Sequence, residues 1–456
     1  MTLRFYNSLT NQKEDFRPIH EGEVSMYVCG MTVYDSCHLG HARAMMAFDI
    51  LVRYLKNQDY KVKFVRNITD VDDKIIERAI QNNESIGDLT QRTIASMQED
   101  FAQLGLVLPN TEPRATDYIP GMIEMIEGLI QKGHAYHSPG GDVFFAVRTF
   151  PEYGKLSNKN IDDLNPGARI AEDDSKKDPL DFVLWKSAKE GEPSWDSPWG
   201  QGRPGWHIEC SVMSFENLGE HFDIHGGGPD LLFPHHENEI AQSECASGNK
   251  FANYWLHSGL LKINGEKMSK SLGNFAMLKD LFISYHPEVI RYYLVSSHYR
   301  SSLNFDQESL NQAKSALTRL YQALASMEGE GNELDQDMMN QFSLVMNDDL
   351  NTPEALSLLF QLAKSINNSS DPTKKMKYGT TLKKLSGVLG LLQDDPKTFF
   401  QFGATLSDKE IGQQIALRNI ARDKKDFQTA DKIRDSLIEQ GIILDDSSEG
   451  TTWKKS

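Results

Sequence analysis

The sequence predicts an α/β protein: a parallel-sheet domain divided by an inserted connective segment, followed by a helical bundle and a small α+β C-terminal module. Short apolar stretches alternate with helical periodicity before residue 70 and again after residue 205. The intervening residues 151–205 are rich in Pro, Gly, Asp and Trp. After about residue 306 the pattern is helical, until an apolar stretch near the C-terminus indicates a β-element.

The first half of the sheet domain opens with a predicted strand at residues 24–29 (VSMYVC). The loop GMTVYDSCHLG follows, then a helix from about residue 41 to 56 and a strand at residues 61–68. Strand, glycine-containing loop, helix and strand are the order of a Rossmann-type nucleotide-binding unit. A further helix is predicted to open near Asp70, and residues 86–133 have a helical pattern.

The inserted segment begins with a predicted hairpin, AYHSPGGDVFFAV, whose turn is Gly140-Gly141. We expect the following residues, 151–205, to be irregular. The α/β pattern then resumes with a strand at residues 222–225, a glycine-rich turn, a helix from about His235 and a strand at residues 253–259. These elements complete the predicted parallel sheet.

Length and composition describe a globular protein of several domains. Of 456 residues, 39% are hydrophobic and 25% are charged, which fits about two to four domains. The start, MTLRFYNSLTNQKEDF, lacks the apolar run of a signal peptide, and no stretch reaches transmembrane length. Four scattered cysteines argue against a disulfide framework. We therefore expect a cytoplasmic protein with no membrane contact.

The charge distribution restricts the mode of any nucleic-acid binding. The formal net charge of −17 argues against broad, nonspecific affinity, so a nucleic-acid partner would need local basic surfaces. From residue 401 to the end, nine Lys or Arg accompany ten Asp or Glu. This C-terminal region is therefore the part of the chain least repulsive toward phosphate.

Two short motifs point to polyphosphate chemistry. His38-Leu39-Gly40-His41 stands directly before a predicted helix, where two histidines and the helix dipole can face phosphate oxygens. Lys267-Met268-Ser269-Lys270-Ser271 lies on a predicted loop, where two lysines can bring mobile positive charge to the same oxygens. Together they resemble the HIGH and KMSKS signatures of class I aminoacyl-tRNA synthetases, with Leu39 in place of isoleucine.

The segment DLLFPHHENE indicates a metal site. His235 and Glu239 are four residues apart, so on a helix opened by Pro234 they project from one face. Imidazole and carboxylate both suit zinc, and two cysteines from separate segments could complete a tetrahedron. Clusters of this kind are more often ordinary hydrogen-bonded residues, and His236 is an alternative ligand. The residues by themselves leave both questions open.

Three segments narrow the resemblance to one branch of the class. MYVCG, GWHIECS and FPHHENEIAQS are similar to the zinc-bearing segments of cysteinyl-tRNA synthetases, and the similarity extends along the whole chain. The resemblance implies one zinc ion on Cys29, Cys210, His235 and Glu239. It also implies that Thr69, Trp206 and His225 help to form the cysteine pocket. Zinc can bind a substrate thiolate, whereas the hydroxyl of serine ionises too reluctantly to compete.

The resemblance also implies the residues of the ATP site. His38, His41, Lys267 and Lys270 are the expected catalytic residues, and Mg²⁺ is expected with the ATP. The expected nucleotide contacts are Gly40, Gly228, Asp230, Met268, Ser269 and Lys270, with Asp230 on the ribose hydroxyls. Activation would need positioning and charge neutralisation rather than a nucleophilic side chain.

The implied activity is that of an ATP-dependent cysteine–tRNA ligase, which forms AMP and diphosphate and acts on tRNA(Cys), ATP and L-cysteine. We expect a monomer with six parts. They are two catalytic halves (1–120 and 206–262), a connective insertion (121–205), a KMSKS-bearing stem-contact region (263–305), a helical bundle (306–400) and an anticodon-binding module (401–456).

Three alternatives use the same residues differently. A cysteine ligase acting on an amino sugar would lack the full module after residue 401. A zinc hydrolase would use three protein ligands and an activated water, and would leave KMSKS unexplained. A non-catalytic tRNA-binding paralogue does not need intact HLGH and KMSKS motifs. Basic residues of the C-terminal module are candidate tRNA contacts, although we expect at least half of them to lie on a solvated helix face with i,i+4 salt bridges: Arg418, Arg422, Lys424, Lys425 and Arg434.

Overall fold

The structure, a computed structural model, describes residues 2–163, 175–267, 275–327, 329, 331–447 and 450–455. The chain forms two compact units. Unit 1 comprises Met1–Met277, Leu294–Phe305 and Ser343–Glu354, and unit 2 comprises Leu278–Tyr293, Asp306–Phe342 and Ala355–Ser456. Among the described helices, none combines the length and apolar character that crossing a membrane requires.

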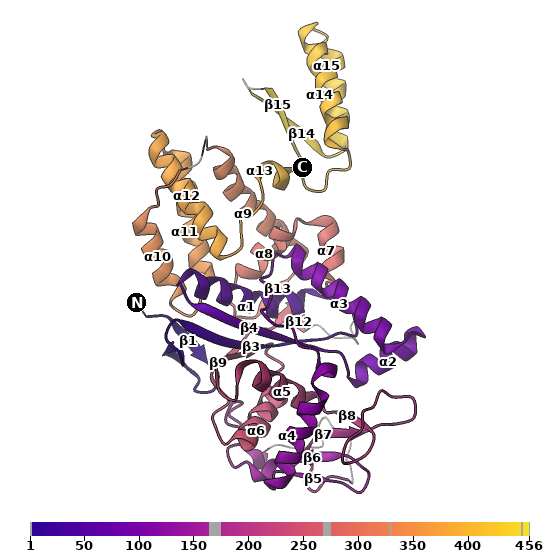
Figure 1. Ribbon diagram of the computed structural model, residues 1–456. Coiled ribbons are helices and arrows are strands. Elements are labelled where there is room, and N and C mark those ends of the chain that lie inside the picture. Colours follow the sequence, from indigo (N-terminus) through magenta and orange to yellow (C-terminus); the bar gives the residue numbers. More distant parts are fainter. Residues whose placement is uncertain are drawn as a thin grey trace. The chain divides into compact units, whose positions relative to one another are not determined.

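A four-stranded parallel sheet forms the centre of unit 1 (Figure 1). Its order is β10 (Ala252–His257), β9 (Phe222–Gly227), β3 (Glu23–Thr32) and β4 (Lys61–Thr69). All three neighbouring pairs are parallel. The first half of the domain supplies β3 and β4, the second half supplies β9 and β10, and the halves join at the β3–β9 pair. The predicted split Rossmann-type sheet is confirmed, and ligands of such sheets bind where the two halves meet.

Helices cover both faces of this sheet. α1 (Leu39–Asn57) packs on β4 and β9, whereas α5 (Trp206–Leu218) packs on β3 and β4 from the opposite side (Figure 1). α6 (Glu237–Ser247) lies beside α5. The further helices of the first half and of the insertion are α2 (Asp73–Asn82), α3 (Ile86–Gln103) and α4 (Ile119–Gln131).

Two predicted helices have different bounds in the structure. The pattern over residues 86–133 is interrupted between α3 and α4, because Gly105, Pro109 and Pro113 break the helix there. The helix expected from His235 begins at Glu237, after the short turn η5 (Leu232–His236). Phe233 in that turn is extended (φ −144°, ψ 131°), as the residue before a proline tends to be.

The insertion is more ordered than its composition predicts. A four-stranded antiparallel sheet runs in the order β5 (Ala135–His137), β6 (Val143–Phe145), β7 (Phe182–Ser187) and β8 (Gly202–Pro204). The predicted hairpin is its β5–β6 pair, but β7 and β8 contradict the expectation that residues 151–205 are irregular throughout. Residues 164–174 of that span lie outside the described residues. β7 is stabilised by pairing with β6 and by the fully buried Trp185, contacts that local composition does not encode.

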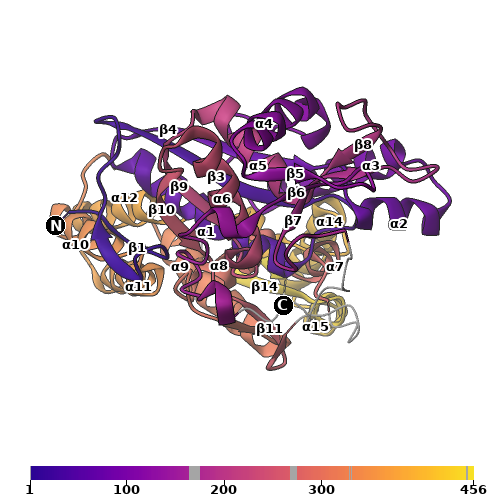
Figure 2. The ribbon, with the colours of Figure 1, turned by 90° about the horizontal axis from the view of Figure 1, so that it is seen from below.

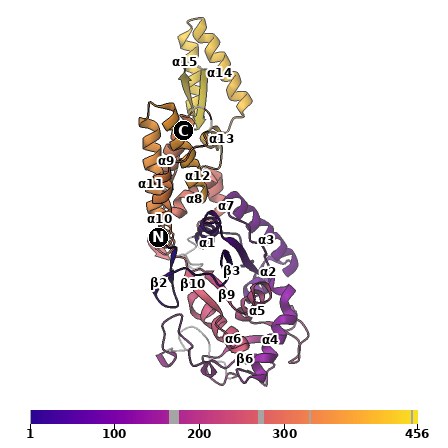
Figure 3. The same ribbon diagram turned by 60° about the vertical axis from the view of Figure 1, so that its left-hand side comes forward.

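An N-terminal hairpin completes unit 1. β1 (Arg4–Asn7) and β2 (Gln12–Asp15) pair antiparallel, and β1 lies beside β10 (Figures 2 and 3). The N–H of Ser8 donates to the carbonyl oxygen of Trp255 at 2.9 Å. Ser8 is thereby held at the end of β10, next to His257.

A small sheet carries the chain into the lysine motif. β11 (Leu261–Ile263) pairs in parallel with β13 (Leu303–Phe305) and antiparallel with β12 (Glu266–Lys267). Helices predominate after residue 277, and the predicted helical C-terminal region is confirmed. They are α7 (Leu278–Ser284), α8 (Pro287–Val295), α9 (Gln307–Ala325), α10 (Gln336–Met346), α11 (Thr352–Asn368), α12 (Pro372–Val388), α13 (Pro396–Gln401), α14 (Asp408–Asp423) and α15 (Phe427–Glu439).

The predicted C-terminal β-element is the antiparallel hairpin of β14 (Ile442–Ser447) and β15 (Gly450–Lys455). α14 and α15 pack together, and α15 packs on β14. Ile411, Leu437 and Ile442 form a small hydrophobic core at this junction.

Candidate metal centre and nucleotide site

Four potential metal ligands meet where the two halves of the sheet join. Cys29 lies on β3, Cys210 on α5, His235 in the turn η5 and Glu239 on α6. All are buried, with exposed fractions of 3%, 1%, 2% and 0%. The Sγ atoms of Cys29 and Cys210 are 3.6 Å apart, although the two residues are 181 positions apart in the chain. The structure thus brings together the four residues that the sequence singles out.

The spacing of the four ligand atoms suits a tetrahedral metal ion. Bonds of about 2.0–2.3 Å from a tetrahedral ion place its ligand atoms about 3.3–3.8 Å apart. Cys29 Sγ is 3.4 Å from Glu239 Oε1, and Cys210 Sγ is 3.6 Å from His235 Nε2. The shortest edge, His235 Nε2 to Glu239 Oε1, is 2.9 Å and corresponds to an ion pair. Three of these four separations fall in the tetrahedral range, and all four ligand atoms lie within 4.8 Å of one another.

The protonation of the cluster also favours a metal ion. Burial raises the pKa of the Cys210 thiol, but the hydrogen bond from Cys29 and the charge of His235 outweigh burial and lower this pKa to about 6. Burial and the neighbouring Cys210 raise the pKa of Cys29. Burial opposes the ionisation of Glu239, yet His225 and His235 hold the pKa of that carboxyl well below its usual range. Negative charge accumulates on Cys210 and Glu239, where a cation can replace protons.

His207 fixes the orientation of the candidate ligand His235. His207 Nδ1 lies 2.8 Å from His235 Nδ1, so that the Nε2 of His235 faces Cys210 and Glu239. Partners of this kind fix the ring orientation of metal-binding histidines. His207 stands in the quoted segment GWHIECS, but nothing in its spacing distinguishes it as a partner of His235.

The three predicted pocket residues adjoin the same cluster. The half-buried ring of Trp206 stacks on His235 with the ring centres 4.1 Å apart. His225 Nε2 is 2.8 Å from Glu239 Oε2. The hydroxyl of Thr69 donates at 2.9 Å to Oε2 of Glu209, the neighbour of Cys210. Burial and the adjacent Cys210 raise the pKa of Glu209, a buried carboxyl that the sequence analysis missed.

The HLGH motif forms the start of α1. The Nδ1 of His38 accepts from the backbone N–H of His41, and the Nδ1 of His41 accepts from the backbone N–H of His38, both at 3.3 Å. This reciprocal capping box leaves the Nε2 of each ring available. The two rings stack with their centres 3.6 Å apart.

Burial favours the neutral form of both histidines of the motif. Burial lowers the pKa of His38 to about 4, and burial together with His38 lowers the pKa of His41 well below its usual range. Because each Nδ1 accepts a hydrogen bond, each neutral ring carries its proton on Nε2. The motif therefore offers two uncharged N–H donors to an anion.

The lysine motif lies mostly outside the described residues. Lys267 ends β12, where its backbone pairs with Lys262, whereas Met268, Ser269, Lys270 and Ser271 are not described. Beyond the motif, the N–H of Leu39 donates to the carbonyl oxygen of Ala276 at 2.8 Å. The chain that leaves the motif is thus attached to the HLGH turn.

The glycine-rich turn after β9 lies near the same histidines. A Cβ at Gly226 would stand 2.1 Å from Cε1 of Phe48, so close packing between β9 and α1 requires glycine. The exposed Asp230 follows this turn, and its negative charge partly offsets the lowering of the His38 pKa by burial. Gly228 is buried, and a Cβ there would stand 2.7 Å from Oδ1 of Asp230.

Unit 2 contains a groove with a basic and aromatic lining. Its volume is about 1250 Å³, and α9, α13 and the β14–β15 hairpin contribute to its walls. Aromatic rings contribute to the lining, and the half-buried Trp453 is among them. The lysines of the lining are Lys314, Lys383, Lys397, Lys454 and Lys455.

Most of the predicted basic contacts are instead ion-paired. Arg418 and Arg422 both bind Asp446, at 2.7 and 2.8 Å, and Arg434 pairs with acidic neighbours on its own helix. Within the described part of the chain, Lys424 and Lys425 make no such pair. Three of the five residues are thus ion-paired, but Arg418 and Arg422 pair with Asp446 on β14 rather than with i,i+4 neighbours on their own helix.

Comparison with known proteins identifies the family. Residues 15–315 match the family model described as "tRNA synthetases class I (C) catalytic domain", and residues 341–393 match the model described as "DALR domain". The chain is 55% identical over 463 residues to a protein of Methylococcus capsulatus named "Cysteine--tRNA ligase", covering 99% of this chain and 100% of that one. The chain belongs to the cysteinyl-tRNA synthetase family.

Other members of the cysteinyl-tRNA synthetase family are equally similar over their whole length. "Cysteine--tRNA ligase" of Legionella pneumophila is 55% identical over 456 residues, with 99% of each chain covered. Solved class I synthetases share the fold. Methionyl-tRNA synthetase of Mycobacterium tuberculosis, in complex with methionyl-adenylate, has a TM-score of 0.57 at 14% identity, covering 80% of this chain and 89% of that chain. LeuRS of Agrobacterium radiobacter has a TM-score of 0.59 at 11% identity, covering 84% and 87%.

Proposed function

We propose that the chain activates L-cysteine with ATP and transfers it to the 3′ end of tRNA(Cys). A carboxylate oxygen of cysteine attacks the α-phosphorus, and the bond from that phosphorus to the bridging oxygen breaks, so that diphosphate leaves. A terminal hydroxyl of the tRNA then attacks the carbonyl carbon of the adenylate, and AMP leaves. The observation that carries the proposal is a buried Cys/Cys/His/Glu cluster in a chain with the HLGH turn.

The metal ion of this proposal is zinc, held by Cys29, Cys210, His235 and Glu239. Two thiolates, one imidazole and one carboxylate form a donor set that zinc accepts, and the spacing of the ligand atoms suits its tetrahedral geometry. When bound, zinc supplies a Lewis acid that favours a substrate thiolate over a hydroxyl. A zinc hydrolase would use three protein ligands with an activated water, and it would leave the lysine motif unexplained.

The protein's own side chains orient the amino acid in this proposal. Trp206 stacks on His235 and offers an apolar wall beside it. His225 holds Glu239, and Trp255 stacks on His225 with a centre separation of 4.3 Å, so that both positions are fixed by packing. Thr69, through its bond to Glu209, fixes the wall next to Cys210. Discrimination by size alone would give only about 10–200-fold selectivity.

The phosphate side combines the HLGH turn with the lysine motif. His38 and His41 donate from Nε2 to phosphate oxygens as neutral groups, and the N-terminus of α1 adds its dipole. Lys267 and Lys270 add positive charge, with Mg²⁺ on the diphosphate portion. Asp230 accepts from the ribose hydroxyls next to Gly228, and Gly40, Met268 and Ser269 contact the nucleotide.

On the tRNA side, we assign the anticodon loop to residues 401–456 and the groove of unit 2. Unpaired bases stack on aromatic rings while lysines neutralise the backbone, and Trp453 with its neighbouring lysines offers both. The other parts keep the roles expected of them: catalytic halves at 1–120 and 206–262, insertion at 121–205, stem contacts at 263–305 and a bundle at 306–400. The enzyme acts as a cytoplasmic monomer without a membrane partner.

Pyrophosphate exchange and aminoacylation test the proposal. With cysteine and ATP the chain should exchange pyrophosphate without tRNA, and serine should not replace cysteine. It should charge a tRNA that carries a GCA anticodon and leave tRNAs with other anticodons uncharged. Exchange with cysteine but charging of no tRNA would favour a ligase with a different acceptor. No exchange with any amino acid would contradict the proposal.

A further inference from the structure

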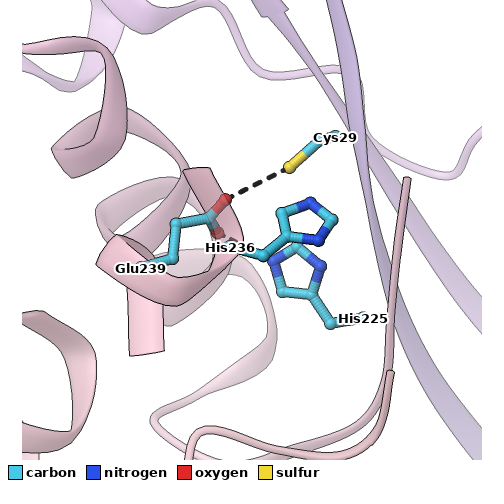
Figure 4. A group of neighbouring side chains, drawn as sticks. All are labelled: Cys29, His225, His236 and Glu239. Carbon is cyan, nitrogen blue, oxygen red and sulfur yellow. Dashed lines mark hydrogen bonds and ion pairs between the residues drawn. The ribbon is translucent and has the colours of Figure 1, made fainter. Parts of the chain in front are cut away.

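A second set of four potential ligands lies beside the first and shares two of its members. Cys29 and Glu239 belong to both sets, and His225 and His236 complete the second (Figure 4). One ligand atom from each of these four residues lies within 4.8 Å of all the others. Each of the four is at most 3% exposed.

The carboxylate of Glu239 faces the two sets with different oxygens. Oε1 lies 2.9 Å from His235 Nε2 of the first set, whereas Oε2 lies 2.8 Å from His225 Nε2 of the second. Cys29 Sγ is 3.4 Å from Oε1, as the dashed line in Figure 4 marks. A cation on either side of the carboxylate would therefore have one carboxylate oxygen and the same thiolate within reach.

An unsatisfied nitrogen marks the second set as a binding position. His236 is fully buried, and its Nδ1 lies 2.8 Å from His257 Nε2. His257 Nδ1 in turn lies 2.8 Å from the hydroxyl of Ser8, so the ring of His236 is fixed from behind. Its Nε2 has no hydrogen-bond partner among the described residues. A buried polar nitrogen of this kind calls for a ligand.

We infer that the centre has two overlapping metal positions: an outer one on Cys29, Cys210, His235 and Glu239, and an inner one on Cys29, His225, His236 and Glu239. One ion occupies one position at a time, because the two share Cys29 and Glu239. The inner donor set has one thiolate, two imidazoles and one carboxylate, which suits zinc or cobalt(II). The inner position should therefore retain a metal ion when Cys210 and His235, the two ligands that belong only to the outer position, are replaced.

This inference rests on the metal site of the proposed function, and cobalt(II) titration of the full-length chain tests it. The wild-type chain should bind one equivalent of Co²⁺ with a charge-transfer band for two thiolates. The C210S/H235Q variant, which keeps only the shared ligands of the outer position, should still bind one equivalent, with about half that band intensity because one thiolate remains. When H225Q and H236Q are added to the C210S/H235Q variant, Co²⁺ binding should be abolished. When H221Q, at an exposed histidine, is added instead, Co²⁺ binding should persist.

The outcomes distinguish failure of the proposed metal site as a whole from failure of the inner position alone. If the wild-type chain binds no Co²⁺, the metal site of the proposed function fails. If the wild type binds one equivalent but a folded C210S/H235Q variant binds none, the inner position alone is overturned. If circular dichroism shows that the C210S/H235Q variant does not fold, the single variant H235Q is titrated with Co²⁺ instead. The intensity of its thiolate charge-transfer band then tests the inner position. One-thiolate intensity supports the inner position, and two-thiolate intensity contradicts it.

Discussion

The backbone N–H of Leu39 donates to the carbonyl oxygen of Ala276 at 2.8 Å, and the adjacent His38 stacks on Phe275 with ring centres 5.3 Å apart. The HLGH turn thus contacts the described residues Phe275 and Ala276, which follow the KMSKS motif in the chain. The first residue of the motif, Lys267, pairs through its backbone with Lys262 in the β11–β12 hairpin.

Replacing Lys270 by alanine should slow activation without changing substrate preference. Loss of one charged donor to the phosphates should reduce the rate of cysteine-dependent pyrophosphate exchange by about 100-fold. The preference for cysteine over serine should persist, because the residues proposed to read the thiol are elsewhere. Lys262→Ala, on the paired strand β11, is the control and should retain near-normal exchange. A large fall in cysteine preference for Lys270→Ala would contradict this division of roles.

Cys210→Ser should weaken discrimination between cysteine and serine. The substitution replaces one thiolate of the cluster by a hydroxyl that does not ionise, so the metal-centred recognition should suffer by at least about tenfold. The ratio of kcat/KM values for the two amino acids in pyrophosphate exchange measures the effect. Cys245→Ser, at a half-buried cysteine outside both ligand sets, should leave the ratio unchanged. Equal ratios for the two variants would remove the basis of the selectivity argument.

Acidification should destabilise the turn at the start of α1. The folded pKa of His38 is about 4, below the value near 6.5 of an unfolded histidine. The unfolded chain therefore binds the proton more readily, so this contribution to stability is present above about pH 6.5 and is lost as the pH falls toward 4. The melting temperature of His38→Asn, which keeps a capping side chain without the titrating ring, should depend less on pH in this window. A slope identical to that of the wild type would contradict the assignment.

Arg43→Lys should destabilise the fold although it preserves the charge. The buried guanidinium donates to several backbone carbonyls, among them those of His298 at 2.6 Å and Ser301 at 3.1 Å. A lysine ammonium cannot reach them all, and the unpaired carbonyls should cost about 3 kcal/mol in the free energy of unfolding. Urea denaturation measures this cost. Arg53→Lys on the same helix, where one exposed bond and one ion pair are affected, should cost less than about 1 kcal/mol.

Trp453→Ala should weaken tRNA binding and spare activation. Loss of one stacking ring should cost about 1–3 kcal/mol of binding free energy. The Kd for a tRNA(Cys) transcript, measured at fixed salt, tests this, and pyrophosphate exchange without tRNA should be unchanged. Phe427→Ala, at an exposed ring of the same module, is the matched control. Equal effects of the two variants would argue against the groove as the anticodon site.

The sequence predicts the sheet domain well because each half carries its own signals. The strand at 24–29, the helix after HLGH and the strand at 61–68 follow local periodicity, and the structure places them as β3, α1 and β4. β7 escapes prediction because its order comes from pairing with β6 rather than from its own surroundings.

For the metal ligands too, contacts between distant segments cannot be predicted from local sequence. The spacing of His235 and Glu239 predicts that they are neighbours. Two cysteines from separate segments are candidates to complete the site, and the resemblance implies that they are Cys29 and Cys210. The role of His236 depends on a nitrogen left unpaired by His257 and Ser8, residues that local spacing does not connect to it.

The reciprocal cap between His38 and His41 has a practical consequence for mutagenesis. Each imidazole closes the first turn of α1 with one nitrogen and presents the other outward. Alanine at either position would remove an anion donor and also fray the helix, at a cost of about 1 kcal/mol. An alanine scan would therefore exaggerate the chemical importance of both histidines. Asparagine at position 38 retains the helix start and isolates the lost donor, so the rate difference between the two substitutions measures how much of the motif's effect is architecture.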